Sequence, residues 1–186
     1  MNLSNSISSP QGRITGKRKW AVRLVLFLCF IGVVSALAYH YRVEIRYTLM
    51  IEKFYRDIES VQIDIDAMKE LGSEVALLDV REPKEYQVSH IQGSRNVPFK
   101  WAKKNSEWME QIAEGKPVIL YCSIGYRSGV LAKQLMETGR TDVFNLYGGI
   151  VHWFNQGNAV YRDGKEVNRI HPYSDEFGYY ITRLMD

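Results

Sequence analysis

Cysteine is scarce in this 186-residue sequence, which contains only two. Cys29 lies inside an apolar run and Cys122 follows another, so the pattern does not favour a disulfide between them. No two cysteines have the spacing of a zinc site, and the four histidines are scattered. We therefore expect neither a disulfide scaffold nor a bound metal, and nothing in the sequence indicates another cofactor.

Charge of one sign is also scarce. The formal net charge is only +3, and the basic residues beyond the N-terminus are dispersed. Proteins that bind nucleic acids typically gather lysine and arginine on one face or along one helix. We therefore expect no nucleic-acid partner. The hydrophobic content of 46% and the charged content of 24% are ordinary for a globular domain with its own core.

One long apolar run lies near the N-terminus. Residues 24–39 contain no charged side chain and would span about 24 Å as a helix, whereas a full crossing of a bilayer takes roughly 20 residues. Arg23 can extend its side chain toward the interface, and Trp20 and Tyr41 are placed like interfacial aromatics. We therefore predict a single transmembrane helix over residues 20–41.

A secretory signal is the alternative for this run, because "ALA" at 36–38 resembles a cleavage site. A buried core helix fits less well, since the run has no polar face. Five basic residues precede the run and four follow it, and those that precede it include the cluster "KRK" at 17–19. This bias predicts a cytoplasmic N-terminus and a C-terminal domain on the periplasmic side, whether anchored or released.

Composition divides the chain into five segments. Residues 1–19 form a polar tail, residues 20–41 the anchor or signal, and residues 42–60 a predicted amphipathic connecting helix. Residues 61–160 have the pattern of one folded domain. Residues 161–186 form a polar and aromatic C-terminal extension to which the sequence assigns no structure.

Buried-strand patterns alternate with helical patterns in the folded domain. Apolar runs at 74–81, 116–122 and 142–146 are typical of buried strands, and residues 127–138 have helical spacing. This order predicts an α/β fold with a doubly wound parallel sheet and helices on both faces. Ligands bind beyond the carboxyl ends of such strands, where the sequence places both Asp79 and Cys122.

Cys122 lies in a short turn from strand to helix. Gly125 permits a tight turn, and the helix that begins near Arg127 directs its N-terminal amides toward the sulfur. Such a nest of amides would stabilise a reactive thiolate or an oxyanion. The local pattern alone also fits a cysteine that serves as a small core residue, and an Arg127 that is merely solvated.

Three segments together resemble a known family. They are "DVREPKEYQVSHIQGSRNVP" at 79–98, "VILYCSIGYRSGVLAKQLMETG" at 118–139 and "VFNLYGGIVHW" at 143–153. In this order they resemble a single-domain rhodanese, a sulfurtransferase, over about residues 61–160. The resemblance implies that Cys122 is the nucleophile and carries a persulfide. It also implies a cradle made by the backbone amides of Ser123, Ile124, Gly125, Tyr126 and Arg127.

The resemblance implies supporting roles for two residues of the first segment. We expect Asp79 to accept hydrogen bonds from loop amides or to pair with Arg127, and Arg81 to face the substrate or Glu82. A polar strand end with no direct part in catalysis explains both residues equally well. The Cys-x4-Arg spacing of Cys122 and Arg127 is shorter than the Cys-x5-Arg loop of related phosphatases, which disfavours phosphatase activity.

The sequence thus predicts a membrane-tethered sulfurtransferase. Its donor would be thiosulfate-like or a persulfide, and its acceptor a thiol, cyanide or a protein. The folded domain contains no second cysteine to release the sulfur as an internal disulfide. The alternative is a non-catalytic binding or scaffold module with the same fold. Retention of Cys122, Gly125 and Arg127 favours the enzyme.

Overall fold

The computed structural model describes residues 15–56, 58, 61–105, 108, 115–183 and 185. The chain divides after Arg42 into two compact units, 1–42 and 43–186. Most of the predicted polar tail 1–19 lies outside the described residues.

The first unit contains the apolar part of helix α1, which runs from Thr15 to Tyr55 without a break. Within the described residues, α1 is the one helix long and apolar enough to cross a membrane, judged by length and composition. A secretory signal near an N-terminus has the same properties. The choice between anchor and signal therefore stays a prediction.

The second unit begins in the last turns of α1. Val43, Tyr47, Ile51 and Tyr55 recur at every fourth position and are buried against the folded domain. Residues four apart lie on one face of a helix, so this spacing makes a single apolar stripe. The segment predicted as a separate connecting helix at 42–60 is thus, over residues 43–55, the end of α1 and part of the domain core.

A five-stranded parallel sheet forms the centre of the domain. Its order is β1-β5-β4-β2-β3, and every pairing is parallel. Parallel strands need crossover connections, and the helical segments predicted between them supply these. The strands are β1 (Gln62–Ile63), β2 (Ala76–Asp79), β3 (Arg95–Asn96), β4 (Val118–Tyr121) and β5 (Val143–Leu146).

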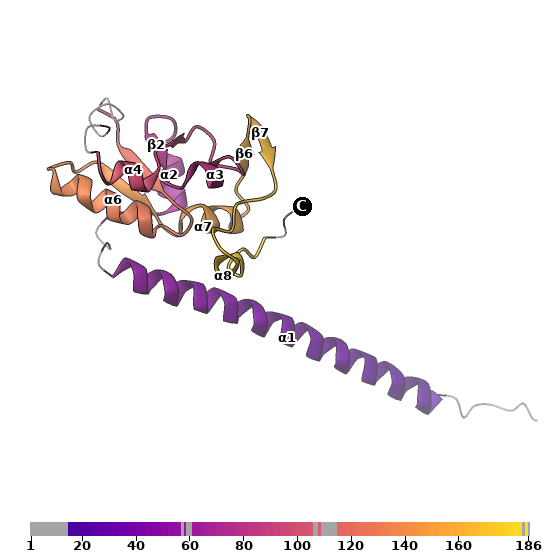
Figure 1. The fold of residues 1–186 in the computed structure, drawn as a ribbon. Coiled ribbons are helices and arrows are strands. Elements are labelled where there is room, and N and C mark those ends of the chain that lie inside the picture. Colours follow the sequence, from indigo (N-terminus) through magenta and orange to yellow (C-terminus); the bar gives the residue numbers. More distant parts are fainter. Residues whose placement is uncertain are drawn as a thin grey trace, which may run out of the picture. The chain divides into compact units, whose positions relative to one another are not determined.

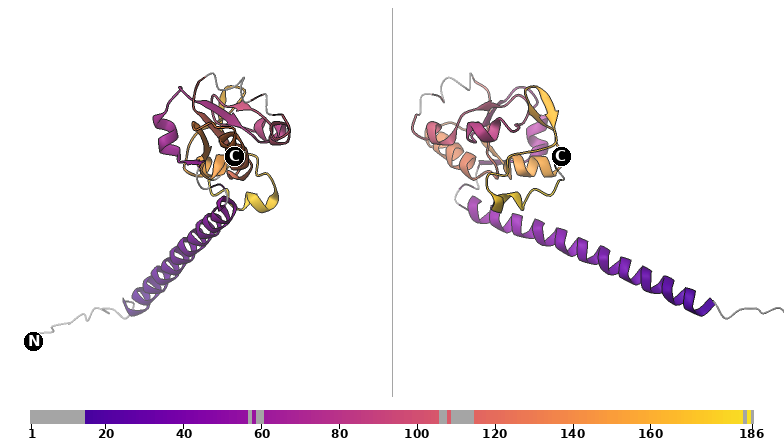
Figure 2. Two further views of the ribbon diagram at one scale, coloured as in Figure 1. Left: turned by 90° about the vertical axis from the view of Figure 1, so that its left-hand side faces the viewer. Right: turned by 45° about the vertical axis from the view of Figure 1, so that its right-hand side comes forward.

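Helices cover both faces of this sheet, as the sequence predicts (Figure 1 and Figure 2). One apolar cluster joins the end of α1 with α2 and α7, and a second joins α4 and α6. Side chains of β4 alternate between them, with Ile119 in the first cluster and Leu120 in the second. The helices between the strands are α2 (Ile65–Glu70), α3 (Pro83–Tyr86), α4 (Phe99–Ala102), α6 (Tyr126–Glu137) and α7 (Gly149–Asn155).

The C-terminal extension, which the sequence left unassigned, has regular structure. Strands β6 (Val160–Arg162) and β7 (Lys165–Val167) form an antiparallel hairpin, seen in yellow in Figure 1. Asp163 and Gly164 both have positive φ, as a two-residue type I′ turn requires. Helix α8 (Asp175–Gly178) follows, and its Phe177 packs against the first apolar cluster.

Candidate functional site

The cysteine loop connects the end of β4 to the start of α6. Gly125 is the N-cap of α6 and has φ +91°, a conformation that side chains other than glycine rarely adopt. A Cβ atom at Gly125 would lie only 1.6 Å from the Tyr55 hydroxyl oxygen. Glycine is therefore needed here both for the turn and for the close approach of Tyr55.

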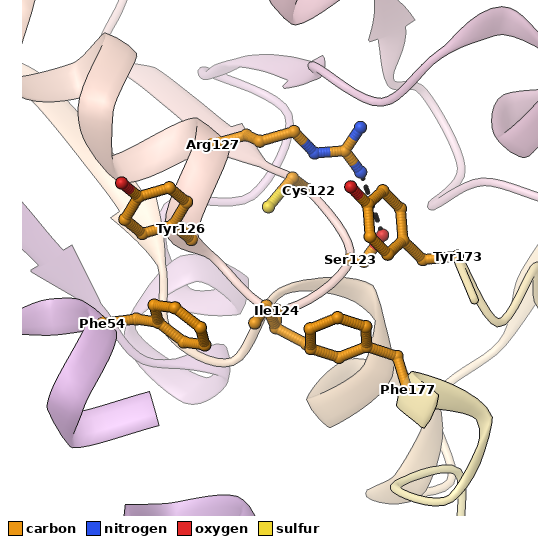
Figure 3. A pocket seen from close by; sticks show the side chains of 8 residues that line it. All are labelled: Phe54, Cys122, Ser123, Ile124, Tyr126, Arg127, Tyr173 and Phe177. Atoms are coloured by element: carbon orange, nitrogen blue, oxygen red, sulfur yellow. Dashed lines mark hydrogen bonds between the residues drawn. The ribbon is translucent and has the colours of Figure 1, made fainter. Parts of the chain in front are cut away.

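The sulfur of Cys122 lies at a cavity within this loop. The residue is only 1% exposed, but it lines a cavity of about 190 Å³. The Gly125 N–H donates a hydrogen bond to Sγ at 3.2 Å. The sulfur thus faces the cavity and has a backbone amide aimed at it, one of the five amides that the sequence predicts for the cradle. Figure 3 shows the residues that line the cavity: Phe54, Cys122, Ser123, Ile124, Tyr126, Arg127, Tyr173 and Phe177.

Arg127 is held in place by Glu85, which the sequence analysis did not single out. The Nη1 and Nη2 atoms of Arg127 donate to the two carboxylate oxygens of Glu85 at 3.0 and 2.9 Å. Ser123 Oγ donates to the same carboxylate at 3.0 Å and accepts from Arg127 Nη2 at 3.1 Å. Loop and arginine therefore share one buried carboxylate, and the predicted pairing of Arg127 with Asp79 is wrong.

The pKa shifts of Arg127 and Glu85 keep both side chains charged. Burial alone would lower the pKa of Arg127, but its hydrogen bonds to Glu85 and the nearby Cys122 raise that pKa above the ordinary value. Burial alone would raise the pKa of the Glu85 carboxyl, whereas the hydrogen bonds from Arg127 lower it. At neutral pH the two side chains therefore form an ion pair beside the cavity.

Asp79 pairs instead with Arg81, two residues along the chain. Arg81 Nε donates to both carboxylate oxygens of Asp79 at 3.0 Å, and Nη2 donates to Oδ2 at 2.6 Å. Both side chains have no exposed surface. Because Arg81 hydrogen-bonds to Asp79 and does not line the cavity, the expectation that it faces the substrate or Glu82 is wrong. Residues two apart at a strand end point to the same side, and Arg81 Nη2 also donates to the Ser89 carbonyl.

Two tyrosine hydroxyls at the end of α1 form hydrogen bonds with the cysteine loop and with the turn before α7. The Tyr55 hydroxyl donates to the Ile124 carbonyl at 2.7 Å and accepts from the Gly148 N–H at 2.9 Å. The Tyr47 hydroxyl donates to the Gly148 carbonyl at 2.9 Å. Tyr55 therefore joins the cysteine loop to the turn before α7. Tyr55 was not predicted as a residue of the site, although the apolar stripe of α1 indicates that this segment packs on the domain.

The first turn of α7 also supports the cysteine loop. The Ile150 N–H donates to the Cys122 carbonyl at 2.9 Å, and the Val151 N–H donates to the Ser123 carbonyl at 3.0 Å. A Cβ atom on Gly149 would lie 2.4 Å from the Cys122 carbonyl oxygen. The second glycine of the "YGG" motif thus permits this close backbone approach.

Aromatic side chains from outside the predicted domain 61–160 complete the cavity. Phe54 comes from α1, while Tyr173 and Phe177 come from the C-terminal extension. The Tyr173 ring centroid lies 4.9 Å from the guanidinium carbon of Arg127. No structure was predicted for the extension that contains Tyr173 and Phe177, and Phe54 was not predicted as a residue of the site.

A protein family and several known proteins are similar to this chain in sequence. The family described as "Rhodanese-like domain" matches residues 64–156, half of the chain. A protein of Bacillus subtilis, YqhL, named as uncharacterized, is 35% identical over 130 residues, which are 70% of this chain and 89% of that protein.

Two further relatives have names that state an activity. A thiosulfate sulfurtransferase of Coxiella burnetii, GlpE, is 31% identical over 80 residues, which are 43% of this chain and 72% of that protein. A probable adenylyltransferase/sulfurtransferase of Mycobacterium tuberculosis, MoeZ, is 34% identical over 85 residues, which are 46% of this chain but only 21% of that protein.

A solved structure of a rhodanese-related protein from Thermoplasma volcanium is also similar. It is 26% identical with a TM-score of 0.49, and the match covers 54% of this chain and 97% of that one. The sheet topology, the cysteine loop and the family match over half of the sequence lead to one conclusion. The chain belongs to the family of rhodanese-like proteins.

Proposed function

We propose that the protein is a sulfurtransferase that carries a sulfane sulfur on Cys122 as a persulfide. The observation that supports this best is the position of Sγ, which lines a cavity and accepts the Gly125 N–H. A cysteine that served only as a core residue would need neither the cavity nor the directed amide. An amide and a helix N-terminus stabilise a sulfur anion before and after it gains the second sulfur.

The reaction has two displacement steps. In the first, the Cys122 thiolate attacks the outer sulfur of a donor persulfide R–S–SH, and R–S⁻ leaves with the electron pair of the broken S–S bond. The product is Cys122–S–SH. In the second, an acceptor thiolate R′–S⁻ attacks the outer sulfur and leaves as R′–S–SH, which restores the Cys122 thiolate. No external oxidant or reductant is needed. Because the domain has no second cysteine, the acceptor is a separate thiol, cyanide or a protein.

The two arginines have different roles in this proposal. Arg127 lies at the cavity and supplies positive charge beside the reacting sulfurs, with Glu85 and Ser123 fixing its orientation. Arg81 and Asp79 are buried and do not line the cavity. We therefore assign Asp79 and Arg81 as positioning residues that hold the end of β2.

Mass spectrometry of the intact native protein tests the persulfide. After incubation with a sulfur donor we expect an adduct of about 32 Da, one sulfur atom, that cyanide removes as thiocyanate. Cys122→Ser should show neither the adduct nor thiocyanate formation. Cys29→Ser is the matched control, because Cys29 lies in α1 outside the domain, and it should behave as the wild type. Sulfur transfer by Cys122→Ser would rule out Cys122 as the carrier. Absence of transfer and of the adduct in the wild type would favour a binding module.

We further propose that residues 20–41 tether the domain to a membrane as a single-pass helix, with the domain on the periplasmic side. The length and composition of α1 support this proposal. A reporter that is active only in the cytoplasm should be silent when fused at the C-terminus. N-terminal sequencing of the membrane-bound protein should find residues 1–35 intact. A mature chain that begins after the "ALA" at 36–38 would mean a cleaved signal, and an active reporter would reverse the orientation.

A further inference from the structure

We propose that the cavity above Cys122 selects a sulfur donor with an apolar organic group over an inorganic dianion such as thiosulfate. This inference rests on the sulfur transfer proposed above and assigns the class of donor to that same site. It depends on three properties of the cavity: the side chains that form its walls, its size, and the pairing of its charges.

Two pairs of aromatic rings form the walls of the cavity. The ring centroids of Phe54 and Tyr126 are 5.2 Å apart on one side, and those of Tyr173 and Phe177 are 5.4 Å apart on the other. Ile124 lies between the pairs, and all five side chains surround the sulfur in Figure 3. An apolar cavity of about 150 Å³ can hold a benzene ring. The volume of about 190 Å³ above Cys122 is therefore large enough for one aryl or branched alkyl group.

The charges at the site offer little to a dianion. Arg127 is the one cationic side chain among the lining residues, and Glu85 already takes hydrogen bonds from both of its terminal nitrogens. The charges of Arg127 and Glu85 therefore cancel. A second pair, Asp79 and Arg81, is buried and does not line the cavity. An inorganic dianion would lose its hydration shell here without gaining an unpaired cation, whereas an apolar group gains from burial.

The walls come mainly from outside the part of the chain that the family matches. That match covers residues 64–156, whereas Phe54, Tyr173 and Phe177 precede or follow it. Within the match, the lining residues are the loop Cys122–Ile124 with Tyr126 and Arg127. The central domain thus supplies the reacting sulfur, its charges and the side chains of Ile124 and Tyr126, and the two added segments supply the other three apolar side chains of the wall.

Thiosulfonates test the proposed donor preference, because their reaction with Cys122 stays the same while the organic group changes. The Cys122 thiolate attacks the outer sulfur of R–SO₂–S⁻, the S–S bond breaks, and the sulfinate R–SO₂⁻ leaves with the electron pair. Cyanide then removes the outer sulfur as thiocyanate. Benzenethiosulfonate and methanethiosulfonate have the same charge and the same reactive group, and they differ in the apolar group R.

The experiment measures kcat/KM of the full chain in detergent with both thiosulfonates and with thiosulfate. We expect the benzene compound to exceed the methyl compound about tenfold, the effect of burying roughly 50 Å² of additional apolar surface, and thiosulfate to be the poorest donor. Phe177→Ala should reduce the ratio between benzene and methyl donors several-fold, and Phe177→Leu should reduce it less. Phe54→Ala removes the opposite wall and should reduce the ratio in the same way. It replaces Phe177→Ala as the test if that variant fails to fold.

Tyr179→Ala is the matched control, because Tyr179 adjoins α8 but is exposed and does not line the cavity. Its donor ratio should equal that of the wild type. Equal kcat/KM for the two thiosulfonates, or equal ratios in Phe177→Ala and Tyr179→Ala, would overturn the donor assignment and leave sulfur transfer standing. Absence of transfer and of the persulfide adduct with all three donors would overturn sulfur transfer itself, and the donor assignment with it.

Discussion

Two arginine–carboxylate pairs with buried carboxylates, Asp79–Arg81 and Glu85–Arg127, differ in their surroundings. Asp79–Arg81 follows β2 and is completely buried, with 0% exposure of both side chains. Glu85–Arg127 joins α3 to the first turn of α6, and Arg127 retains 15% exposure at the cavity. The first pair joins residues two apart, while the second joins residues 42 apart. The comparison shows that one pair holds a strand end together and the other connects the reactive loop to the rest of the domain.

The largest effect is expected from Arg81→Ala. The substitution leaves the Asp79 carboxylate buried without its partner, which typically costs about 3–5 kcal/mol of folding free energy. Urea unfolding of the full chain in detergent, followed by tryptophan fluorescence, measures this loss. Arg140→Ala is the matched control, because Arg140 pairs with Asp142 at the surface and should cost less than about 1 kcal/mol. Equal losses in the two variants would contradict a structural role for the buried pair.

Glu85→Gln tests whether the Glu85–Arg127 pair contributes more to sulfur transfer than the Asp79–Arg81 pair does. The substitution removes the charge that holds Arg127 and Ser123, for which we expect a loss of about 2 kcal/mol in stability. Sulfur transfer should fall more in Glu85→Gln than in Arg81→Ala when both are assayed where they are fully folded. If transfer is unchanged in Glu85→Gln, Arg127 does not depend on this carboxylate for its position.

Tyr55→Phe tests whether the end of α1 belongs to the site. The variant keeps the ring but removes a hydroxyl that bonds the Ile124 carbonyl and the Gly148 N–H. We expect a loss of about 1–2 kcal/mol from the unpaired buried groups, together with a lower kcat for transfer, because the cysteine loop loses a support. Tyr179→Phe changes an exposed ring and serves as control. Identical kcat values in the two variants would show that Tyr55 supports the fold alone.

The smallest effect on the free energy of unfolding is expected from lowering the pH. Because the pKa of Glu85 is lowered in the folded state, its ion pair contributes fully above the ordinary value of 4.5. The contribution should disappear as the pH falls from there through the lower folded pKa. The difference in unfolding free energy between wild type and Glu85→Gln should therefore be constant from pH 6 to 8 and shrink below about 4.5. A difference that shrinks between pH 8 and 6 would assign the effect to another group.

Much of the sheet could be predicted because its signals are local. The apolar runs at 74–81 and 116–122 contain β2 and β4, and the helical spacing at 127–138 nearly coincides with α6. The hairpin β6–β7 was missed although "RDGK" at 162–165 contains an Asp-Gly turn, a strong local signal. The polar and aromatic composition of the extension does not by itself indicate this turn.

The partners of the charged residues could be predicted only in part. Asp79 and Arg81 are two apart at a strand end, so their pairing follows from the period of a strand. The pairing of Arg127 with Glu85 spans 42 residues and depends on where α3 packs against the loop. The contribution of Tyr55 spans 69 residues to Ile124 and 93 to Gly148, and no local pattern indicates such distances.

Strands β2, β4 and β5, helix α6, the apolar character of α1 and the place of Cys122 at the carboxyl end of a strand could all be predicted from the sequence. These follow from periodicity and turn chemistry within short windows of the chain. The carboxylate that holds Arg127 and the aromatic rings that surround the sulfur are set by tertiary packing. Those contacts join segments far apart in the chain, and their free energy exists only once the sheet and helices have packed together.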